Sequence, residues 1–254
     1  MPAPSVAELR RVAQPEGVLG RRSGEHWAGR LYMRHVSIYA TRVLVALRVA
    51  PNTVTAGMIV IGLLAGPALL LPGVWGALLA ALLVQLYLLL DCSDGEVARW
   101  TGRTSISGVY LDRVGHYLCE AAFMVGLGLR ADDLEVGGYA MLGTLTALGV
   151  VLIKAETDLV DVARARAGLP AAEDASAAPR SSGVALARRL AAGLRLHRLL
   201  GAVEASLLVL AVAVVDAVRG DLRATQVTVV VLVVVAGLQL VAHLVSILAS
   251  RRLA

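Results

Sequence analysis

Long apolar runs alternate with short polar segments along most of the chain. One crossing of a bilayer takes roughly 20 predominantly apolar residues. On this basis we expect six transmembrane helices, at residues 54–71, 74–94, 107–129, 138–158, 199–218 and 225–248. The pattern therefore predicts an all-α, polytopic membrane protein with one six-helix transmembrane domain at residues 51–250.

The chain before residue 51 has a different pattern. Residues 1–24 are rich in Pro, Gly and Arg and are expected to form a mobile cytoplasmic tail, with one short helix around residues 6–12. Residues 25–50 alternate apolar positions with arginines, which predicts an amphipathic helix lying in the interface of an anionic membrane leaflet. A solvated helix packed on the domain would explain the same pattern. Pro51-Asn52 separates this helix from the first crossing.

Composition and charge agree with a membrane location and give an orientation. Hydrophobic residues make up 57% of the chain and charged residues only 17%, which is unusual for a soluble domain. Among the arginines, only Arg130, Arg219 and Arg223 fall in loops assigned to the outside. The positive-inside rule therefore places both termini in the cytoplasm. We expect the protein to lie in the cell (inner) membrane, with its site on the cytoplasmic face.

One long cytoplasmic loop is expected at residues 161–198. Its first half is polar, Ala-rich and expected to be flexible, and its second half is a basic helix. The basic helix is suited to bind lipid headgroups or an anionic substrate, although topology signalling alone would also account for it.

The most informative stretch is residues 91–117, where ionisable side chains interrupt two apolar segments. Such groups are unfavourable in a membrane and usually mark a functional site. Residues three or four apart share a helix face, so Asp91 and Asp94 line one helix while Asp112 and His116 line the next. Three carboxylates would repel one another without a cation. Their hard oxygen atoms favour Mg²⁺ or Mn²⁺, bound jointly by protein and phosphate.

The same stretch also contains small residues and an arginine. Gly95, Ala98 and Gly108 leave room for a ligand, and Arg99 is suited to a bidentate contact with phosphate oxygens. A single glycine or arginine at a helix end more often has a packing or capping role. The whole set instead indicates a diphosphate held by metal and arginine.

These residues resemble the signature of the CDP-alcohol phosphotransferase (CDP-alcohol phosphatidyltransferase) family, D-x2-D-G-x2-A-R-x8-G-x3-D-x3-D. The last position differs, because His116 stands in place of the fourth Asp. The other seven positions match the signature: Asp91, Asp94, Gly95, Ala98, Arg99, Gly108 and Asp112. Pro51, Asn52 and Thr55 similarly resemble the P-N-x-x-T element of the family.

The resemblance implies an integral-membrane transferase that moves a substituted phosphate from a CDP-linked donor to an alcohol and releases CMP, in phospholipid biosynthesis. In such proteins the aspartates bind two divalent metals that hold the donor diphosphate, and the fourth Asp contributes to metal binding and acts as general base. The Gly and Ala positions make room for the cytidine nucleotide, and the Arg contacts phosphate. A homodimer is also implied.

His116 retains the chemistry that its position requires. An imidazole ligates metals and accepts protons near neutral pH, so His116 is predicted to be the base or a metal ligand. The loss of one negative charge should weaken the second metal position or favour a metal that accepts nitrogen. Glu120, one further turn along the helix, is expected to orient the imidazole.

Several alternatives remain at this stage. Basic residues near the site favour a phosphatidyl-type product from CDP-diacylglycerol, but a soluble CDP-alcohol would serve the same site. The exchange at His116 is also compatible with a protein that only binds nucleotide, and a small transporter belongs to a second class. Transporters usually place polar groups near the bilayer midplane between repeats. No nucleic-acid motif is visible.

Other ionisable residues in the apolar segments are weaker candidates: Lys154, Glu156, Asp158, Glu204 and His243. Glu204, together with Arg195 and Arg198, is a candidate for an acceptor pocket. Hydrogen bonds between helices are the more common role for such residues.

Overall fold

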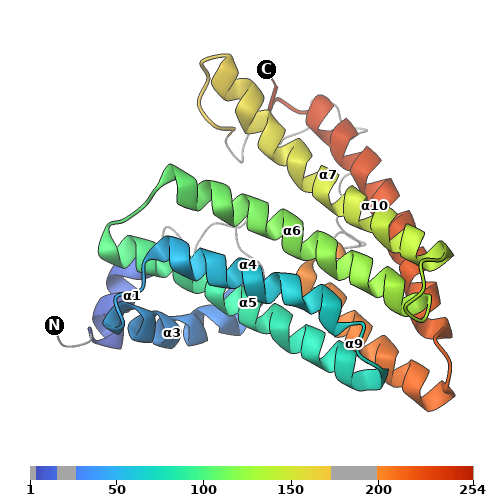
Figure 1. Cartoon of the computed structure of the whole chain (residues 1–254). Coiled ribbons are helices and arrows are strands. Elements are labelled where there is room, and N and C mark those ends of the chain that lie inside the picture. Colours follow the sequence, from blue (N-terminus) through green and yellow to red (C-terminus); the bar gives the residue numbers. More distant parts are fainter. Residues whose placement is uncertain (1–3, 16–26, 173–198, 254) are drawn as a thin grey trace. The chain divides into compact units, whose positions relative to one another are not determined.

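The computed structural model describes residues 4–15, 27–172 and 199–253, and every regular element in these ranges is helical (Figure 1). The elements are α1 (Val6–Ala13), η1 (Gly29–Met33), α3 (Arg34–Ala46), α4 (Pro51–Ala68), α5 (Gly73–Thr101), α6 (Ile106–Ala131), α7 (Gly138–Arg166), α9 (Ala202–Arg219) and α10 (Arg223–Leu248). The all-α prediction is thus confirmed for the described residues.

Among the described residues, four helices are long and apolar enough to cross a membrane: α4, α5, α7 and α10. Each overlaps a segment expected from the sequence to cross. The other two expected crossings correspond to α6 and α9, in which charged residues lie toward both ends of the helix and leave no uncharged run as long as those of α5 and α7. Asp112, Arg113, Glu120 and Arg130 lie in α6, and Glu204, Asp216 and Arg219 lie in α9.

The described chain divides into two compact units. The first contains the described residues up to Ala65 together with Leu79–Cys119, and the second contains Gly66–Leu78 and the described residues from Glu120 onward. Helices α4, α5 and α6 therefore contribute a segment to each unit. Every residue of the acidic signature falls in the first unit.

Helix α1 lies in the segment expected to be a tail, and it is well defined. Ser5 and Glu8 form a capping box, in which the Ser5 hydroxyl accepts from the Glu8 backbone and the Ser5 N–H donates to Glu8 Oε2 at 2.9 Å. That backbone donor lowers the pKa of the Glu8 carboxyl. Leu9 and Ala13 are fully buried and pack against Ile38 of α3.

The segment expected to be an interfacial helix is helical from Trp27 to Ala46 within the described residues, with a π-helical turn at η1. Ser37, Ile38 and Thr41 of α3 are buried. The large apolar side chains that remain exposed in this segment are Leu31, Val36, Tyr39, Val43 and Leu47. The segment therefore buries hydroxyl groups inward and leaves apolar groups outward.

In the second unit, α10 packs along α7 and against α9 (Figure 1). Asp216 near the end of α9 caps the next helix, because its carboxylate accepts from the backbone N–H of Ala224 at 2.8 Å and of Thr225 at 3.0 Å. Gly220 ends α9 in the left-handed conformation, which lets the chain turn back toward α10. The loop at residues 161–198 begins as part of α7, and its residues 173–198 lie outside the described ranges.

Candidate active site

The acidic signature occupies the end of α5, the start of α6 and the short connection between them. Gly102 adopts a φ of 65°, which closes the α5 end tightly enough for α6 to begin at Ile106. Asp91 and Asp94 lie on α5, and Asp112 and His116 lie on α6. The predicted juxtaposition of two polar helix faces is therefore present within the first unit.

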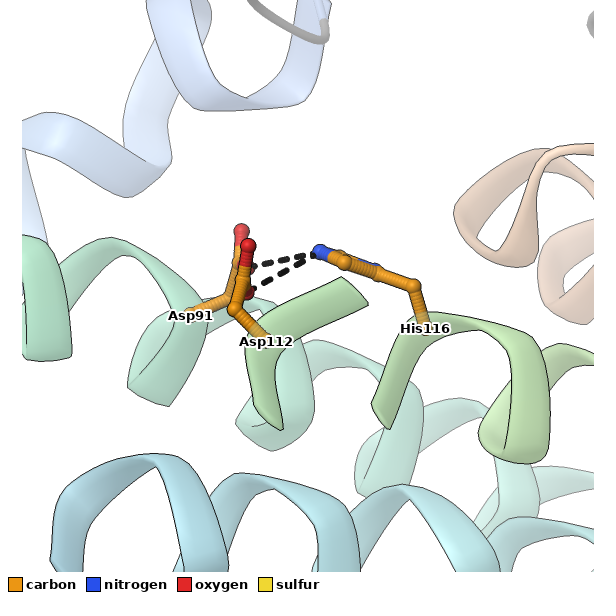
Figure 2. A group of neighbouring side chains, drawn as sticks. All are labelled: Asp91, Asp112 and His116. Carbon is orange, nitrogen blue, oxygen red and sulfur yellow. Dashed lines mark ion pairs between the residues drawn. The ribbon is translucent and has the colours of Figure 1, made fainter. Parts of the chain in front are cut away.

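Asp91, Asp112 and His116 converge on one point (Figure 2). Nε2 of His116 lies 3.1 Å from Oδ1 of Asp91 and 3.4 Å from Oδ1 of Asp112. One ligand atom from each of the three residues lies within 4.8 Å of the others. All three side chains are partly exposed, at 25%, 35% and 25% for Asp91, Asp112 and His116. A divalent cation with two oxygen donors and one nitrogen donor fits this set.

Tyr87 supports His116, a role that sequence analysis did not find. The hydroxyl of Tyr87 contacts Nδ1 of His116, and the two rings meet edge to face with centroids 5.6 Å apart. Tyr87 lies one turn before Asp91 on the same face of α5, so helical spacing was the available signal. With Nδ1 occupied, Nε2 is the nitrogen directed at the carboxylates.

The expected partner of His116 was Glu120, and the structure gives Glu120 a different contact. Its Oε1 accepts a hydrogen bond from Nζ of Lys154 at 2.8 Å, between α6 and α7. Nδ1 of His116, the nitrogen that Glu120 was expected to orient, is instead in contact with Tyr87. An ion pair with lysine stabilises a buried carboxylate more than a hydrogen bond from a neutral imidazole does, which explains the difference.

Asp94 is held by the P-N-x-x-T element. Its Oδ2 accepts a hydrogen bond of 2.7 Å from the hydroxyl of Thr55, which is buried on α4. Asn52 in the same element donates to Ser107 at 3.3 Å, beside Gly108. The two sequence elements that carry the family resemblance are therefore in direct contact.

A hollow open to solvent lies beside the group formed by Asp91, Asp112 and His116. Six of the predicted site residues line it: Asp94, Gly95, Ala98, Arg99, Gly108 and Asp112. Pro51, Asn52 and Thr55 are also in its lining, together with Arg103, Thr104, Ser105 and Val109. Asp112 is the residue common to the hollow and to the three-residue group.

Three of the other ionisable residues of the apolar helices, Lys154, Glu156 and His243, form contacts between helices of the second unit. Lys154 binds Glu120, and Glu156 lies 2.8 Å from Nδ1 of His243, joining α7 to α10. These contacts fit the more common role considered for them. Arg195 and Arg198, the expected neighbours of Glu204, lie outside the described residues.

Fold and site together define the class: a helical membrane protein whose acidic signature spans the ends of two helices around a hollow open to solvent. The model of the CDP-alcohol phosphatidyltransferase family matches residues 48–171, and this segment belongs to that family. The match covers α4, α5, α6 and α7 and therefore the whole site.

A curated relative supports the same assignment. The chain is 28% identical over 155 residues to the bifunctional IPC transferase and DIPP synthase of Thermococcus kodakarensis. The alignment covers 60% of this chain and 33% of the relative, so the chain spans about one third of the relative's length. Family and relative are both named for transferases, the enzyme class predicted from the sequence.

Proposed function

We propose that the protein transfers a substituted phosphate from a CDP-linked donor to an alcohol and releases CMP. In this reaction the alcohol oxygen forms a bond to the phosphorus of the donor, and the bond from that phosphorus to the CMP oxygen breaks. The observation that carries the proposal is the position of Asp112, which belongs both to the three-residue group and to the hollow. A diphosphate in the hollow would lie next to the group best suited to bind a cation.

The residues present fit a divalent metal. Asp91, Asp112 and His116 would hold it, and Asp94 lies close by with one oxygen already accepting from Thr55. When bound, Mg²⁺ or Mn²⁺ would neutralise phosphate charge and polarise the phosphorus. Asp94 remains a proposed metal ligand for a second position, because only one of its two oxygens is taken up by Thr55.

His116 is proposed to be a metal ligand, and Asp112 the group that accepts the proton of the alcohol. His116 directs Nε2 at Asp91 and Asp112, and it does not line the hollow in which the alcohol would lie. Ligation and proton acceptance would also require the same nitrogen, since Nδ1 is in contact with Tyr87. Asp112, by contrast, faces the hollow directly.

The remaining lining residues are proposed to bind the nucleotide and its phosphates. Arg99 would contact the diphosphate, with charge-assisted hydrogen bonds to its oxygens. Gly95, Ala98 and Gly108 would allow the nucleotide to approach the helix backbones. A methyl group at Gly108 would lie 2.9 Å from Oδ1 of Asn52, so even the smallest side chain there would push the Asn52 side chain aside.

The membrane arrangement supports a lipid donor, CDP-diacylglycerol, and hence a phosphatidyl product. We propose six crossings, in which α6 and α9 cross with their charged residues turned to protein partners, and both termini and the site lie on the cytoplasmic side of the cell membrane. The exposed apolar residues of η1 and α3 would then lie in the interface among anionic lipids. A homodimer follows from the family resemblance.

The test is CMP release by the purified protein. CDP-diacylglycerol or a soluble CDP-alcohol is supplied with a panel of alcohols, with Mg²⁺ or Mn²⁺ and with a chelator control. We expect metal-dependent release with CDP-diacylglycerol and one alcohol. CMP release from the soluble CDP-alcohol alone would show that the donor is soluble and is not CDP-diacylglycerol. Nucleotide binding without release from any donor would contradict the proposed catalysis.

A further inference from the structure

Helix α1 is attached to the first unit through its last turn. Leu9 and Ala13 are fully buried against Ile38 and Trp100, so the end of α1 is fixed against both α3 and the end of α5. Two polar contacts follow this apolar one. The carbonyl oxygen of Ala13 accepts a hydrogen bond from Nε of Arg99 at 2.6 Å, and Nε2 of Gln14 donates to Oε1 of Glu96 at 2.8 Å.

Glu96 holds this arrangement together from within the signature itself. Its side chain is completely buried on α5, two residues after Asp94. Ser37 donates to Oε1 at 2.6 Å and Thr41 donates to Oε2 at 2.7 Å. Arg34 forms an ion pair with it at 3.2 Å. A buried carboxylate with this many donors is stable only while all of them stay in place, so it fixes α1 and α3 on α5.

The two sides of the Arg99 guanidinium therefore face different groups. Its Nε edge is bound by α1, while its Nη atoms lie over Gly95, where a methyl group would lie 3.1 Å from Nη1. Its Nη2 is buried and has no hydrogen-bond partner among the residues that the structure describes. An unsatisfied buried donor is unfavourable, and an anion in the hollow that Arg99 lines would satisfy it.

We propose that the end of α1 is a positioning element for Arg99. By accepting from Nε, the Ala13 carbonyl holds the guanidinium so that its Nη edge is presented to the diphosphate of the donor. This inference rests on the proposed function, since it assumes that a CDP moiety occupies the hollow. It assigns a role in nucleotide binding to a segment that precedes the family match at residues 48–171.

The test is CDP binding by the full-length protein in detergent, measured by calorimetry. Leu9→Asp places a charge in the buried contact of α1, and Ala7→Asp places the same charge on its exposed face as the matched control. We expect Leu9→Asp to weaken CDP binding roughly tenfold, the size of one charge-assisted hydrogen bond, and Ala7→Asp to leave it unchanged. Gln14→Leu, a milder change that removes the contact to Glu96, should act in the same direction.

The Arg99→Ala background gives the decisive comparison. If α1 acts through Arg99, Leu9→Asp has no further effect on CDP affinity once Arg99 is removed, and Mn²⁺ affinity is unchanged in every variant. An equal loss in both backgrounds, or unchanged CDP binding in both Leu9→Asp and Gln14→Leu, would overturn the inference while leaving the proposed function intact. No CDP binding by the unaltered protein would overturn both.

Discussion

At the scale of single residues, His116 replaces the fourth Asp of the signature, and Tyr87 contacts this histidine. A histidine has a second ring nitrogen that a carboxylate lacks, and Tyr87 occupies it. Residues that orient a metal-binding histidine typically contribute 10–100-fold, as a rough guide, to metal affinity. The pair is therefore expected to behave as one unit in metal binding.

Tyr87→Phe tests this pairing. It removes the hydroxyl but keeps the ring that packs edge to face on His116. We expect Mn²⁺ binding, followed by electron paramagnetic resonance, to weaken roughly tenfold, with CDP affinity unchanged. Tyr110→Phe, at an exposed tyrosine of α6, is the control. Equal Mn²⁺ affinity in both variants would show that Tyr87 does not orient His116.

His116 itself should determine which metal is preferred. His116→Asp restores an all-oxygen set, so the ratio of Mg²⁺ to Mn²⁺ affinity should rise by roughly tenfold or more. His116→Ala should lower the affinity for both metals. Competition between the two ions in a binding titration gives this ratio directly. An unchanged ratio of Mg²⁺ to Mn²⁺ affinity in His116→Asp would show that His116 is not a metal ligand.

The spacing of the signature was sufficient to predict which residues gather at the site. Residues before and between the signature positions were not predictable in the same way. Tyr87 and Glu96 occupy positions that the family pattern leaves open, and their roles depend on contacts with α6, α1 and α3. Such contacts are set by tertiary packing, which one sequence without relatives does not reveal.

At the scale of elements, α4 and α5 are coupled through Thr55 and Asp94. Thr55→Val keeps the shape of the buried side chain and removes the donor to Oδ2 of Asp94. Loss of a hydrogen bond to a charged group costs about 1.5–3 kcal/mol, so the KM for the CDP donor should rise by about tenfold or more. Thr53→Val, at an exposed position of the same helix, should leave it unchanged. Equal KM values for Thr55→Val and the unaltered protein would show that the P-N-x-x-T element does not contribute to binding of the donor.

Helix positions followed well from hydrophobic pattern, because the apolar runs are long. The expected crossing at 138–158 begins where α7 begins, and the expected crossing at 225–248 ends where α10 ends. Polar helix ends were less predictable. Helix α5 continues past residue 94, where its crossing was expected to end, to Thr101, and α7 continues past residue 158 to Arg166, since helix propensity and packing extend beyond the apolar segment.

At the scale of the whole molecule, the open question is whether α6 and α9 cross the membrane. Within the part of the chain that the structure describes, four helices have the length and composition expected of a crossing, and six crossings require these two as well. Single cysteines labelled in intact cells with an impermeant maleimide distinguish the arrangements. With six crossings, Glu135→Cys between α6 and α7 is labelled, and Leu253→Cys at the other end of α10 is protected. Protection at both positions would mean that α6 does not cross.

We propose that Asp112 takes part both in metal binding and in phosphate transfer at one site. The most direct measurement is metal-dependent CMP release by Asp112→Asn, compared with the unaltered protein and with Asp133→Asn in an exposed loop. We expect release by Asp112→Asn to fall by roughly 10²–10⁴, the contribution of a positioned proton acceptor, and Mn²⁺ binding to weaken in the same variant. CMP release within twofold of the unaltered protein would contradict the proposal.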